Sequence, residues 1–333
     1  MNTVKDSPPA LVIGIDGGNT KTTAIATDLR GHLVGFGSTG SSNWEIEGEE
    51  TAARSIFESI AQALGSASHL PQVQRIHMGL AGLDWPDDEQ RMRKALSPFL
   101  GDIPLSMEND GYLAIRASTV EAVGITVSSG TGVTASFIEP EGSGFFYGYS
   151  AELGGGIDID ARTIYALVRA ADGRGAKTAM TLPILTATGH GTVAELMYSM
   201  TRRGFSVPHD VSRRILFGAA REGDAVAIAV VTGFARELAL LATNLIRKRQ
   251  LEKQSVCVVA SGSLFNKTGP LMFSVFQEEV LKVAPGAKVS LCRIPPAVGA
   301  VRVALDRSGV DSKKIWQNGL SAALTDRLPS DAY

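Results

Sequence analysis

Hydrophobic positions along the first third of the chain predict an alternation of strands and helices. An uninterrupted apolar run at Leu11–Ile15 ends in Asp-Gly-Gly, which is typical of a strand that is buried on both faces and opens into a turn. Runs at Thr22–Thr27 and His32–Ser38 predict two further strands. Apolar residues at helical spacing, followed by Gly65, predict a helix over Thr51–Leu64. The other elements expected here are strands at Val73–Gly79 and Ile103–Met107 and helices at Asp87–Phe99 and from about Asn109. This order indicates a mixed α/β domain over residues 1–118.

The pattern then restarts, which predicts a second α/β domain over residues 119–305. A strand at Val123–Ser128 runs into Ser-Ser-Gly-Thr-Gly, and the apolar character of Ala225–Leu245 predicts a helix buried between layers. Asp224 is a natural N-cap for that helix, and basic side chains lie in its last turn. The remaining elements expected are strands at Val133–Ile138, Phe145–Tyr149 and Ser255–Ala260, and helices at Ile157–Ala171, Asp224–Arg249 and Pro295–Leu305. Residues 309–333 form a polar tail, as a terminal helix or a loose end.

Composition narrows the class of protein. The chain has 333 residues with 32 Lys and Arg against 34 Asp and Glu, a net charge of −2, so the basic face of a nucleic-acid-binding protein is not expected. Glycine is in excess, at 36 residues, while 44% of the chain is hydrophobic, which excludes a disordered chain and indicates many tight turns.

The absence of long apolar runs and of paired cysteines predicts the compartment of the protein and whether it associates with a membrane. No apolar run reaches the length of a membrane span or a signal-peptide core. Cys257 and Cys292 both lie in apolar runs without a neighbouring cysteine, so we expect buried thiols and not a disulfide or a metal pair. A cytoplasmic protein with no membrane partner is the prediction.

Two glycine-containing turns follow one design. IGIDGGNTKT at 13–22 and TVSSGTGVT at 126–134 each run from strand through glycine turn to strand. Such turns let backbone N–H groups close on an anion, and Thr20, Lys21 and Thr131 would add further donors. The carboxylate of Asp16 would repel a phosphate, so we expect it to hold a hydrated Mg²⁺ that bridges phosphates. An isolated turn of this kind is usually an ordinary hairpin. Neither matches the Walker A or the GxGxxG pattern, because strands and not helices follow.

With these turns in view, the chain resembles the actin/sugar-kinase/Hsp70 superfamily. DGGNTKT, SSGTG and VVASGSLFN are similar to its two phosphate turns and its adenosine turn. Five further segments resemble segments of the family in the same order. The sugar loop is similar to SSNW at 41–44, the strand-end turn to GLAG at 79–82, the catalytic segment to END at 108–110, the pocket-closing stretch to GYSAELGGGIDIDAR at 148–162 and the closing helix to PAVGAVRVAL at 296–305. The nearest resemblance is to the BadF/BadG/BcrA/BcrD-type ATPase branch, which includes N-acetylglucosamine kinase.

This resemblance implies two RNase-H-like domains around a central cleft and transfer of the ATP γ-phosphoryl to a sugar hydroxyl, usually the 6-OH. Residues 1–118 would carry the first phosphate turn, the sugar loop and the catalytic aspartate, and residues 119–305 the second phosphate turn and the adenosine turn. The closing helix, near residues 296–308, would pack back on the first domain. ATP and Mg²⁺ are the implied cofactors, an amino sugar is the implied substrate, and we expect a homodimer.

Asp110 is the candidate catalytic base that the resemblance implies. It follows an expected strand and begins an expected helix, so a carboxylate there could face a cleft and accept the proton of a hydroxyl. From the residues alone, Asp110 or Asn109 could equally well cap the helix. Glu108 is expected to orient its neighbour and not to act as base.

The other implied site residues fall into an acceptor set and a nucleotide set. Asn43 suits a sugar hydroxyl or an N-acetyl carbonyl, although Ser-Ser-Asn is also common in loops, and Trp44 either stacks on the sugar or anchors its loop. The acceptor set is Asn43, Trp44, Asn109, Gly148, Tyr149 and Glu152. The nucleotide set is Gly17, Gly18, Asn19, Thr20, Lys21, Gly130, Thr131, Gly132, Gly262, Ser263 and Asn266, with Asp16 for Mg²⁺ through water.

Two departures from the family pattern leave the acceptor open. Glu152 stands where the family commonly has Asp, and Leu153 removes a second carboxylate. N-Acetylglucosamine or glucosamine is the favoured sugar. The alternatives are an ATPase activator of a 2-hydroxyacyl-CoA dehydratase, which needs cluster cysteines in a local motif, a non-catalytic sugar-binding regulator, and an actin-like filament protein.

Overall fold

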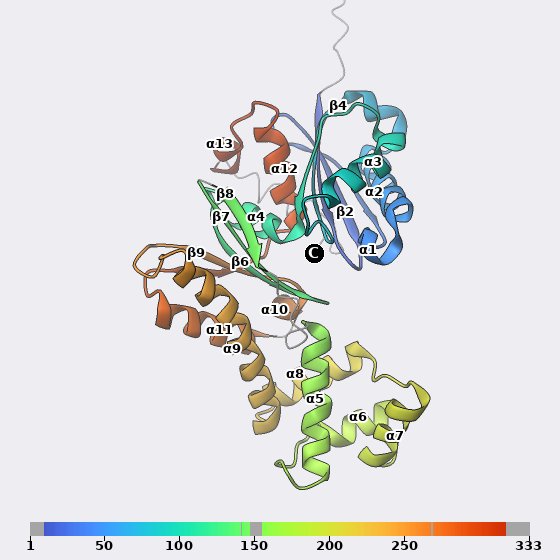
Figure 1. Ribbon diagram of the computed structural model, residues 1–333, viewed down its shortest axis with the longest axis vertical. Coiled ribbons are helices and arrows are strands. Elements are labelled where there is room, and N and C mark those ends of the chain that lie inside the picture. Colours follow the sequence, from blue (N-terminus) through green and yellow to red (C-terminus); the bar gives the residue numbers. More distant parts are fainter. Residues whose placement is uncertain (1–9, 141, 147–154, 268, 318–333) are drawn as a thin grey trace, which may run out of the picture. The chain divides into compact units, whose positions relative to one another are not determined.

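The computed structural model describes residues 10–140, 142–146, 155–267 and 269–317, and these contain two five-stranded sheets (Figure 1). The first sheet has the strand order β3-β2-β1-β4-β5. Its strands are β1 (Leu11–Gly17), β2 (Thr22–Asp28), β3 (Leu33–Thr39), β4 (Val73–Leu80) and β5 (Leu105–Asn109). β1 pairs antiparallel with β2 and parallel with β4, and β5 lies parallel to β4. β1 is therefore the central strand, which explains its continuous apolar run.

Helices pack on both faces of the first sheet. On one face, α2 (Glu49–Leu64) and α3 (Asp88–Leu100) cover a core that includes Ile13 and Ile15. On the other face, α12 (Pro296–Asp306) packs against Val12. Every residue from 297 to 305 is buried. Alternate residues of β1 thus face two separate cores, as the period of a strand requires.

Gly14 brings α12 into direct contact with β1. A Cβ atom at this position would lie 2.7 Å from the carbonyl oxygen of Ala297 and would also collide with the backbone of Val301. The absence of a side chain at Gly14 is therefore what lets the helix backbone rest on the strand.

Arg302 ties α12 to the chain segment that leaves α4 (Leu113–Ser118). Its guanidinium group donates to the carbonyl oxygens of Arg116 and Thr119, both at 2.6 Å, and of Val120 at 2.7 Å. The ring of Trp316, in α13 (Ser312–Gln317), lies 4.3 Å from the guanidinium carbon. Burial lowers the pKa of Arg302 to about 10, which leaves it charged at neutral pH.

The second sheet has the order β10-β9-β6-β7-β8. Its strands are β6 (Gly124–Ser129), β7 (Val133–Glu139), β8 (Gly142–Phe146), β9 (Cys257–Ser261) and β10 (Lys288–Leu291). β9 lies parallel to β6 and to β10. The α-helices described between β8 and β10 are α5 (Gly156–Ala171), α6 (Thr181–Thr188), α7 (Val193–Arg203), α8 (His209–Arg221), α9 (Ala225–Lys248), α10 (Ser263–Lys267) and α11 (Pro270–Val283).

The chain divides into two compact units. The first comprises residues 1–124, 136–144 and 292–333, and the second comprises residues 125–135 and 145–291. The first unit thus extends beyond the boundary expected at residue 118 and takes in the chain from Cys292 onward, because α12 buries its apolar surface against β1. Segments distant in sequence share one core, which hydrophobic periodicity does not reveal.

Several expected elements differ in extent from those observed. The strand expected at Phe145–Tyr149 overlaps β8, which begins earlier, at Gly142, and the expected residues from 147 onward lie outside the described residues. The helix expected from Asn109 begins as a 3₁₀ turn over Asp110–Tyr112 before α4. Asp224 caps α9 as expected, with its carboxylate accepting from the N–H of Ala227 at 2.7 Å.

By length and composition, α9 could cross a membrane, with a mean hydropathy of 1.8. Such a segment was not expected from the sequence, because no uninterrupted apolar run reaches the length of a membrane span. However, α9 buries one side of its length, including Val231, Phe234 and Leu238, and a core helix passes the same length and hydropathy test.

Candidate functional site

The loops that follow the carboxyl ends of β1, β3, β4 and β5 meet at one edge of the first sheet, and we call this region the strand-end site. Asp16 is opposite Gly79 in the pairing of β1 with β4, and Leu80 is opposite Asn109 in the pairing of β4 with β5. In open α/β sheets, ligands bind at this edge. The fold therefore brings the expected Mg²⁺ ligand and the expected base to the same edge.

The first glycine turn, residues 17–21, is locked to its neighbours. Its closing hydrogen bond runs from the N–H of Gly18 to the carbonyl oxygen of Lys21 at 2.9 Å. The carbonyl oxygen of Gly17 accepts from the N–H of Ala81 at 2.8 Å, and a Cβ at Gly17 would lie 2.5 Å from the side chain of Leu80. Asn19 and Thr20 lie exposed at the tip. The base of the turn is thus held by contacts with Leu80 and Ala81, while its tip is exposed to solvent.

Asn43 shapes the loop after β3. It is 6% exposed, and its Oδ1 accepts from the N–H of Glu45 at 2.9 Å, which caps α1 (Trp44–Glu47). Its Nδ2 donates to Oδ1 of Asn19 at 2.7 Å. Asn43 therefore joins the expected sugar loop to the first glycine turn.

Trp44 anchors the same loop, which was one of the two roles left open. Its Nε1–H donates to the carbonyl oxygen of Gly82 at 2.7 Å, and the guanidinium carbon of Arg91 lies 4.3 Å from its ring centroid. Gly82 fits this contact closely, since a Cβ there would lie 2.8 Å from Oδ1 of Asn43. The SSNW and GLAG segments are thus packed on each other.

Asn109 performs the capping role expected of either Asn109 or Asp110. Its Oδ1 accepts from the N–H of Gly111 at 2.9 Å, and its Nδ2 donates to Oδ1 of Asp84 at 2.8 Å. Asn109 is 4% exposed, whereas Asp110 is only partly buried. Asp110 is thereby left out of the cap. Sequence reasoning did not single out Asp84, because only the fold brings its loop to the end of β5.

Burial makes two carboxyls of the strand-end site, those of Asp110 and Asp16, weaker acids than an ordinary aspartate. Burial, followed by the charges of Asp16 and Asp84, raises the pKa of Asp110 to about 7. Burial raises the pKa of Asp16 to about 6, although the charge of Lys21 acts in the opposite direction. Glu108 contrasts with both: burial opposes its ionisation, but hydrogen bonds from His77 and Arg116 lower its pKa to about 2. A carboxyl with a pKa near neutrality suits a general base, and Glu108 does not meet this condition.

The raised pKa of Asp110 predicts how stability depends on pH. The unfolded chain releases this proton near pH 4, while the folded chain keeps it until about pH 7. Over that range the folded state binds more protons, so this carboxyl lowers the free energy of unfolding as the pH rises. Asp110→Asn cannot ionise, and without nucleotide we expect it to be more stable than the unmodified protein at pH 8, by on the order of 2 kcal/mol. Thermal midpoints from pH 4 to pH 8 check this, and a difference that stays constant with pH would contradict it.

The donors at the strand-end site fit Mg²⁺. Mg²⁺ binds through one or two carboxylates, waters and substrate phosphates. Asp16 is a partly buried carboxyl whose ionisation is costly, and a divalent cation would relieve that cost. Among the described residues, no group of three or more His, Cys, Asp or Glu side chains forms a ready-made metal cage, so the fit is to a hydrated ion shared with phosphates.

The second glycine turn, residues 130–132, lies against the start of α5 in the second unit. The N–H of Gly156 donates to the carbonyl oxygen of Gly130 at 2.8 Å. Gly155 has a φ of +60°, and a Cβ there would lie 2.5 Å from the carbonyl oxygen of Gly132, so only glycine fits. Thr131 is exposed at the tip.

The expected adenosine turn adjoins the second glycine turn. Gly262 has a φ of +93°, and a Cβ there would collide with the backbone of Ser129. Ser263 and Asn266 are exposed, and the N–H of Asn266 donates to the carbonyl oxygen of Gly262 at 3.1 Å. Gly148, Tyr149 and Glu152 lie outside the described residues.

An ion-pair cluster that the sequence did not indicate lies near the second glycine turn. Arg213 of α8 donates to Asp160 of α5, with its Nη2 2.8 Å from Oδ2, and His209 Nδ1 is 2.7 Å from the same oxygen. A Cβ at Gly156 would collide with the guanidinium group of Arg213. Asp160 is far from His209 and Arg213 in the chain, so no sequence spacing could have predicted the cluster.

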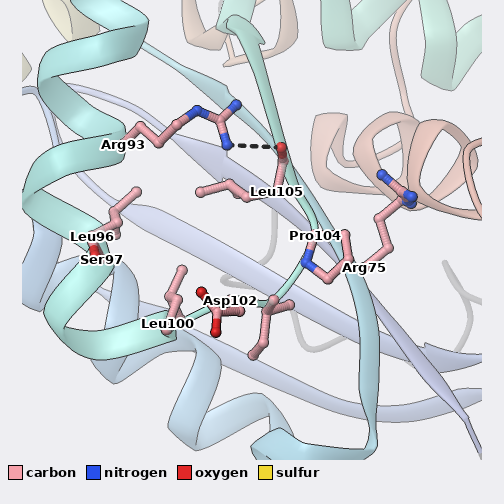
Figure 2. A pocket seen from close by; sticks show the side chains of 10 residues that line it. Arg75, Arg93, Leu96, Ser97, Leu100, Asp102, Pro104 and Leu105 are labelled. Atoms are coloured by element: carbon pink, nitrogen blue, oxygen red, sulfur yellow. Dashed lines mark hydrogen bonds between the residues drawn. The ribbon is translucent and has the colours of Figure 1, made fainter.

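A pocket of about 420 Å³ lies elsewhere in the first unit (Figure 2). It is lined by Arg75, Arg93, Leu96, Ser97, Leu100, Gly101, Asp102, Ile103, Pro104 and Leu105. Arg93 is already engaged, by the carbonyl oxygen of Leu105 and by Glu89. Leu105 begins β5, whereas Asn109 ends it, so this pocket lies at the opposite edge of the sheet from the strand-end site.

Known proteins resemble this chain over most of its length. An N-acetyl-D-glucosamine kinase from Dictyostelium discoideum is 24% identical over 314 residues, which cover 89% of this chain and 98% of the relative. An N-acetylmuramic acid/N-acetylglucosamine kinase from Clostridium acetobutylicum is 28% identical over 302 residues, with 88% and 97% covered.

Solved structures share the fold. A protein from Chromobacterium violaceum, assigned as an N-acetylglucosamine kinase, superposes with a TM-score of 0.66 at 21% identity, covering 89% of this chain and 99% of that one. A ROK family glucokinase from Streptomyces griseus, solved with glucose and AMPPNP, gives a TM-score of 0.57 at 17% identity, covering 89% and 98%. These likenesses confirm the actin-like α/β fold expected from the sequence. The model of the BadF/BadG/BcrA/BcrD ATPase family matches residues 13–304, and this chain belongs to that family.

Proposed function

We propose that this protein is an ATP-dependent amino-sugar kinase that transfers the γ-phosphoryl group of ATP to the 6-OH of N-acetylglucosamine or glucosamine. One observation carries the proposal: Asp110, a partly buried carboxyl with a pKa of about 7, lies at the strand edge that also carries Asp16 and the first glycine turn. A base for a hydroxyl and an anion-binding turn at one edge are what phosphoryl transfer to an alcohol requires.

Asp110 is the proposed catalytic base. Its ionised form accepts the proton of the acceptor hydroxyl as the oxygen bonds to the γ-phosphorus, and the bond from that phosphorus to the β–γ bridging oxygen breaks to release ADP. A carboxylate whose pKa is raised to about 7 is a stronger base than an ordinary aspartate and is still ionised in a substantial fraction of molecules at neutral pH. Glu108 takes no part in this step, because it is held ionised by Arg116.

The nucleotide is bound by the two glycine turns and the adenosine turn. In the first unit, the backbone of Gly17, Gly18 and Asn19, with the side chains of Thr20 and Lys21, faces the phosphates. Asp16 holds Mg²⁺ through water, and when bound the ion neutralises phosphate charge. The second unit contributes Gly130, Thr131 and Gly132 to the phosphates and Gly262, Ser263 and Asn266 to the adenosine.

The acceptor sugar is bound at the loop that Asn43 and Trp44 shape. Asn43 has further hydrogen-bonding capacity beyond its contacts with Glu45 and Asn19, and Trp44 fixes the loop through Gly82. Asn109 acts beside Asp110. We also propose Gly148, Tyr149 and Glu152 as acceptor residues, which the family resemblance implies and which lie outside the described residues. Two similar kinases are named for N-acetylglucosamine, which supports an amino sugar. The active form is a cytoplasmic homodimer.

An acceptor panel tests this function. With Mg²⁺ and ATP, we expect ADP release to depend on the sugar, with N-acetylglucosamine or glucosamine preferred over glucose, N-acetylmannosamine and N-acetylmuramic acid. Mass spectrometry of the product checks that the sugar gains one phosphoryl group, and omission of Mg²⁺ should abolish transfer. ATP hydrolysis that ignores every sugar and leaves the acceptors unphosphorylated would overturn the proposal.

A further inference from the structure

Asp84 is an acidic residue of the strand-end site to which the proposed function gives no role. It lies in the loop after β4, two residues beyond Gly82, and is partly buried. Its Oδ1 accepts a hydrogen bond from Nδ2 of Asn109 at 2.8 Å. Asp84 and Asn109 are 25 residues apart, so this hydrogen bond joins the loop after β4 directly to the end of β5.

Asn109 transmits this contact to the backbone around Asp110. With its Nδ2 held by Asp84, its Oδ1 accepts from the N–H of Gly111 at 2.9 Å. The two hydrogen bonds define which way the amide faces, because the oxygen must point to Gly111 and the nitrogen to Asp84. Asp110 lies between the two residues bridged by this cap, so the amide of Asn109 sets the local direction of its backbone.

Asp88 holds Asp84 in place. Oδ2 of Asp88 accepts from the N–H of Asp84 at 2.8 Å and from the N–H of Trp85 at 2.6 Å. Asp88 is the first residue of α3 and only 3% exposed, so it is fixed by a helix that packs on the core of the first unit. A carboxylate in the first turn of a helix is also favoured by the helix dipole.

We propose that Asp84 is a positioning residue that holds Asn109, and through it Asp110, in the orientation required for transfer to the acceptor. Three hydrogen-bonded links carry this role, from Asp88 to Asp84, from Asp84 to Asn109 and from Asn109 to Gly111. The proposal rests on the proposed kinase function and adds a residue that neither the glycine turns nor the END segment indicates.

Two substitutions separate the hydrogen bond from the charge. Asp84→Ala removes the acceptor of the Asn109 hydrogen bond, and we expect kcat to fall by about 30-fold, with the KM for ATP changed less than about 2-fold, because small misplacements of a reacting group cost up to about 100-fold in rate. Asp84→Asn keeps an oxygen that can accept from Asn109, and we expect it to restore kcat to within about 5-fold of the unmodified enzyme.

Asp87→Ala is the matched control. Asp87 is an exposed acid in the same loop and its side chain makes no capping hydrogen bond to α3, so its kcat should stay within about 2-fold of the unmodified enzyme. Thermal midpoints of all three variants verify folding. If Asp84→Ala fails to fold, Asp84→Leu removes the same acceptor while filling the space of the side chain, and it is expected to show the same loss of kcat.

The outcomes distinguish the two proposals. If the unmodified enzyme phosphorylates its sugar and Asp84→Ala retains full kcat, or if Asp84→Asn is as impaired as Asp84→Ala, the positioning role is wrong while the kinase function stands. If the unmodified protein phosphorylates no sugar, the proposed function itself fails. Loss of kcat in Asp84→Ala with rescue in Asp84→Asn supports both.

Discussion

Asp110→Asn is expected to lower the rate of sugar phosphorylation by about 1000-fold, which is within the range for loss of a general base. The amide is nearly isosteric with the carboxyl, so the turn that begins at Asp110 keeps its shape, but an amide cannot accept the proton of the acceptor hydroxyl. Because the nucleotide is bound by the glycine turns, the dissociation constant for ATP should change little. Steady-state kinetics with the preferred sugar, together with calorimetric titration of ATP, measure both quantities.

A matched substitution shows that the loss is local. Asp87→Asn makes the same chemical change at an exposed carboxylate after β4 and should retain nearly full activity. Asp110→Asn is also the variant that we expect to be more stable at pH 8, so a low rate could not be attributed to unfolding. A rate within about 10-fold of the unmodified enzyme would remove Asp110 as the base.

Gly14→Val is expected to be the most destabilising single substitution described for this fold. The valine Cβ would collide with the backbone of Val301 and lie 2.7 Å from the carbonyl oxygen of Ala297. α12 cannot move away freely, because a Cβ at Gly299, on the helix, would lie 3.0 Å from the backbone nitrogen of Ala117. Overpacking of this kind costs about 3 kcal/mol, which corresponds to a fall of roughly 10 °C in the thermal midpoint.

Gly40→Ala provides the comparison for Gly14→Val. A Cβ at Gly40, just after β3 of the same sheet, would meet no atom within 4 Å. We therefore expect its thermal midpoint to stay close to that of the unmodified protein. Calorimetric scans of the three proteins check both expectations. Equal midpoints for Gly14→Val and the unmodified protein would mean that α12 does not rest on β1 as described.

The glycine turns show how far local sequence leads. DGGNTKT after an apolar run predicts a strand that opens into a turn, and β1 ends at Gly17 as that pattern requires. Asp224 before a long apolar stretch predicts a capped helix, and α9 begins one residue later. In both cases the forces that select the structure act between residues close in the chain: backbone conformation, capping and burial of one continuous apolar run.

The candidate site divides along the same line. Asp110 can be singled out from its neighbours in the chain, although its capping and catalytic roles cannot be separated there. The structure assigns the cap to Asn109, because Asn109 reaches the N–H of Gly111 and is held by Asp84. No feature of residues 79–88 indicates that Asp84 will meet the end of β5, since that contact depends on the parallel pairing of β4 with β5.

The sequence by itself therefore determined the strands β1 to β7 and β9, the glycine turns, Asp16 and Asp110 at the strand ends, and the family. Only the tertiary structure decided that the backbone of α12 rests on β1 at Gly14, that Trp44 anchors its loop on Gly82, and that burial and neighbouring charges raise the pKa of Asp110 to about 7. The physical reason is range. Turns and caps depend on residues within a few positions of one another, whereas desolvation and charge interactions depend on groups that the fold brings together from distant parts of the chain.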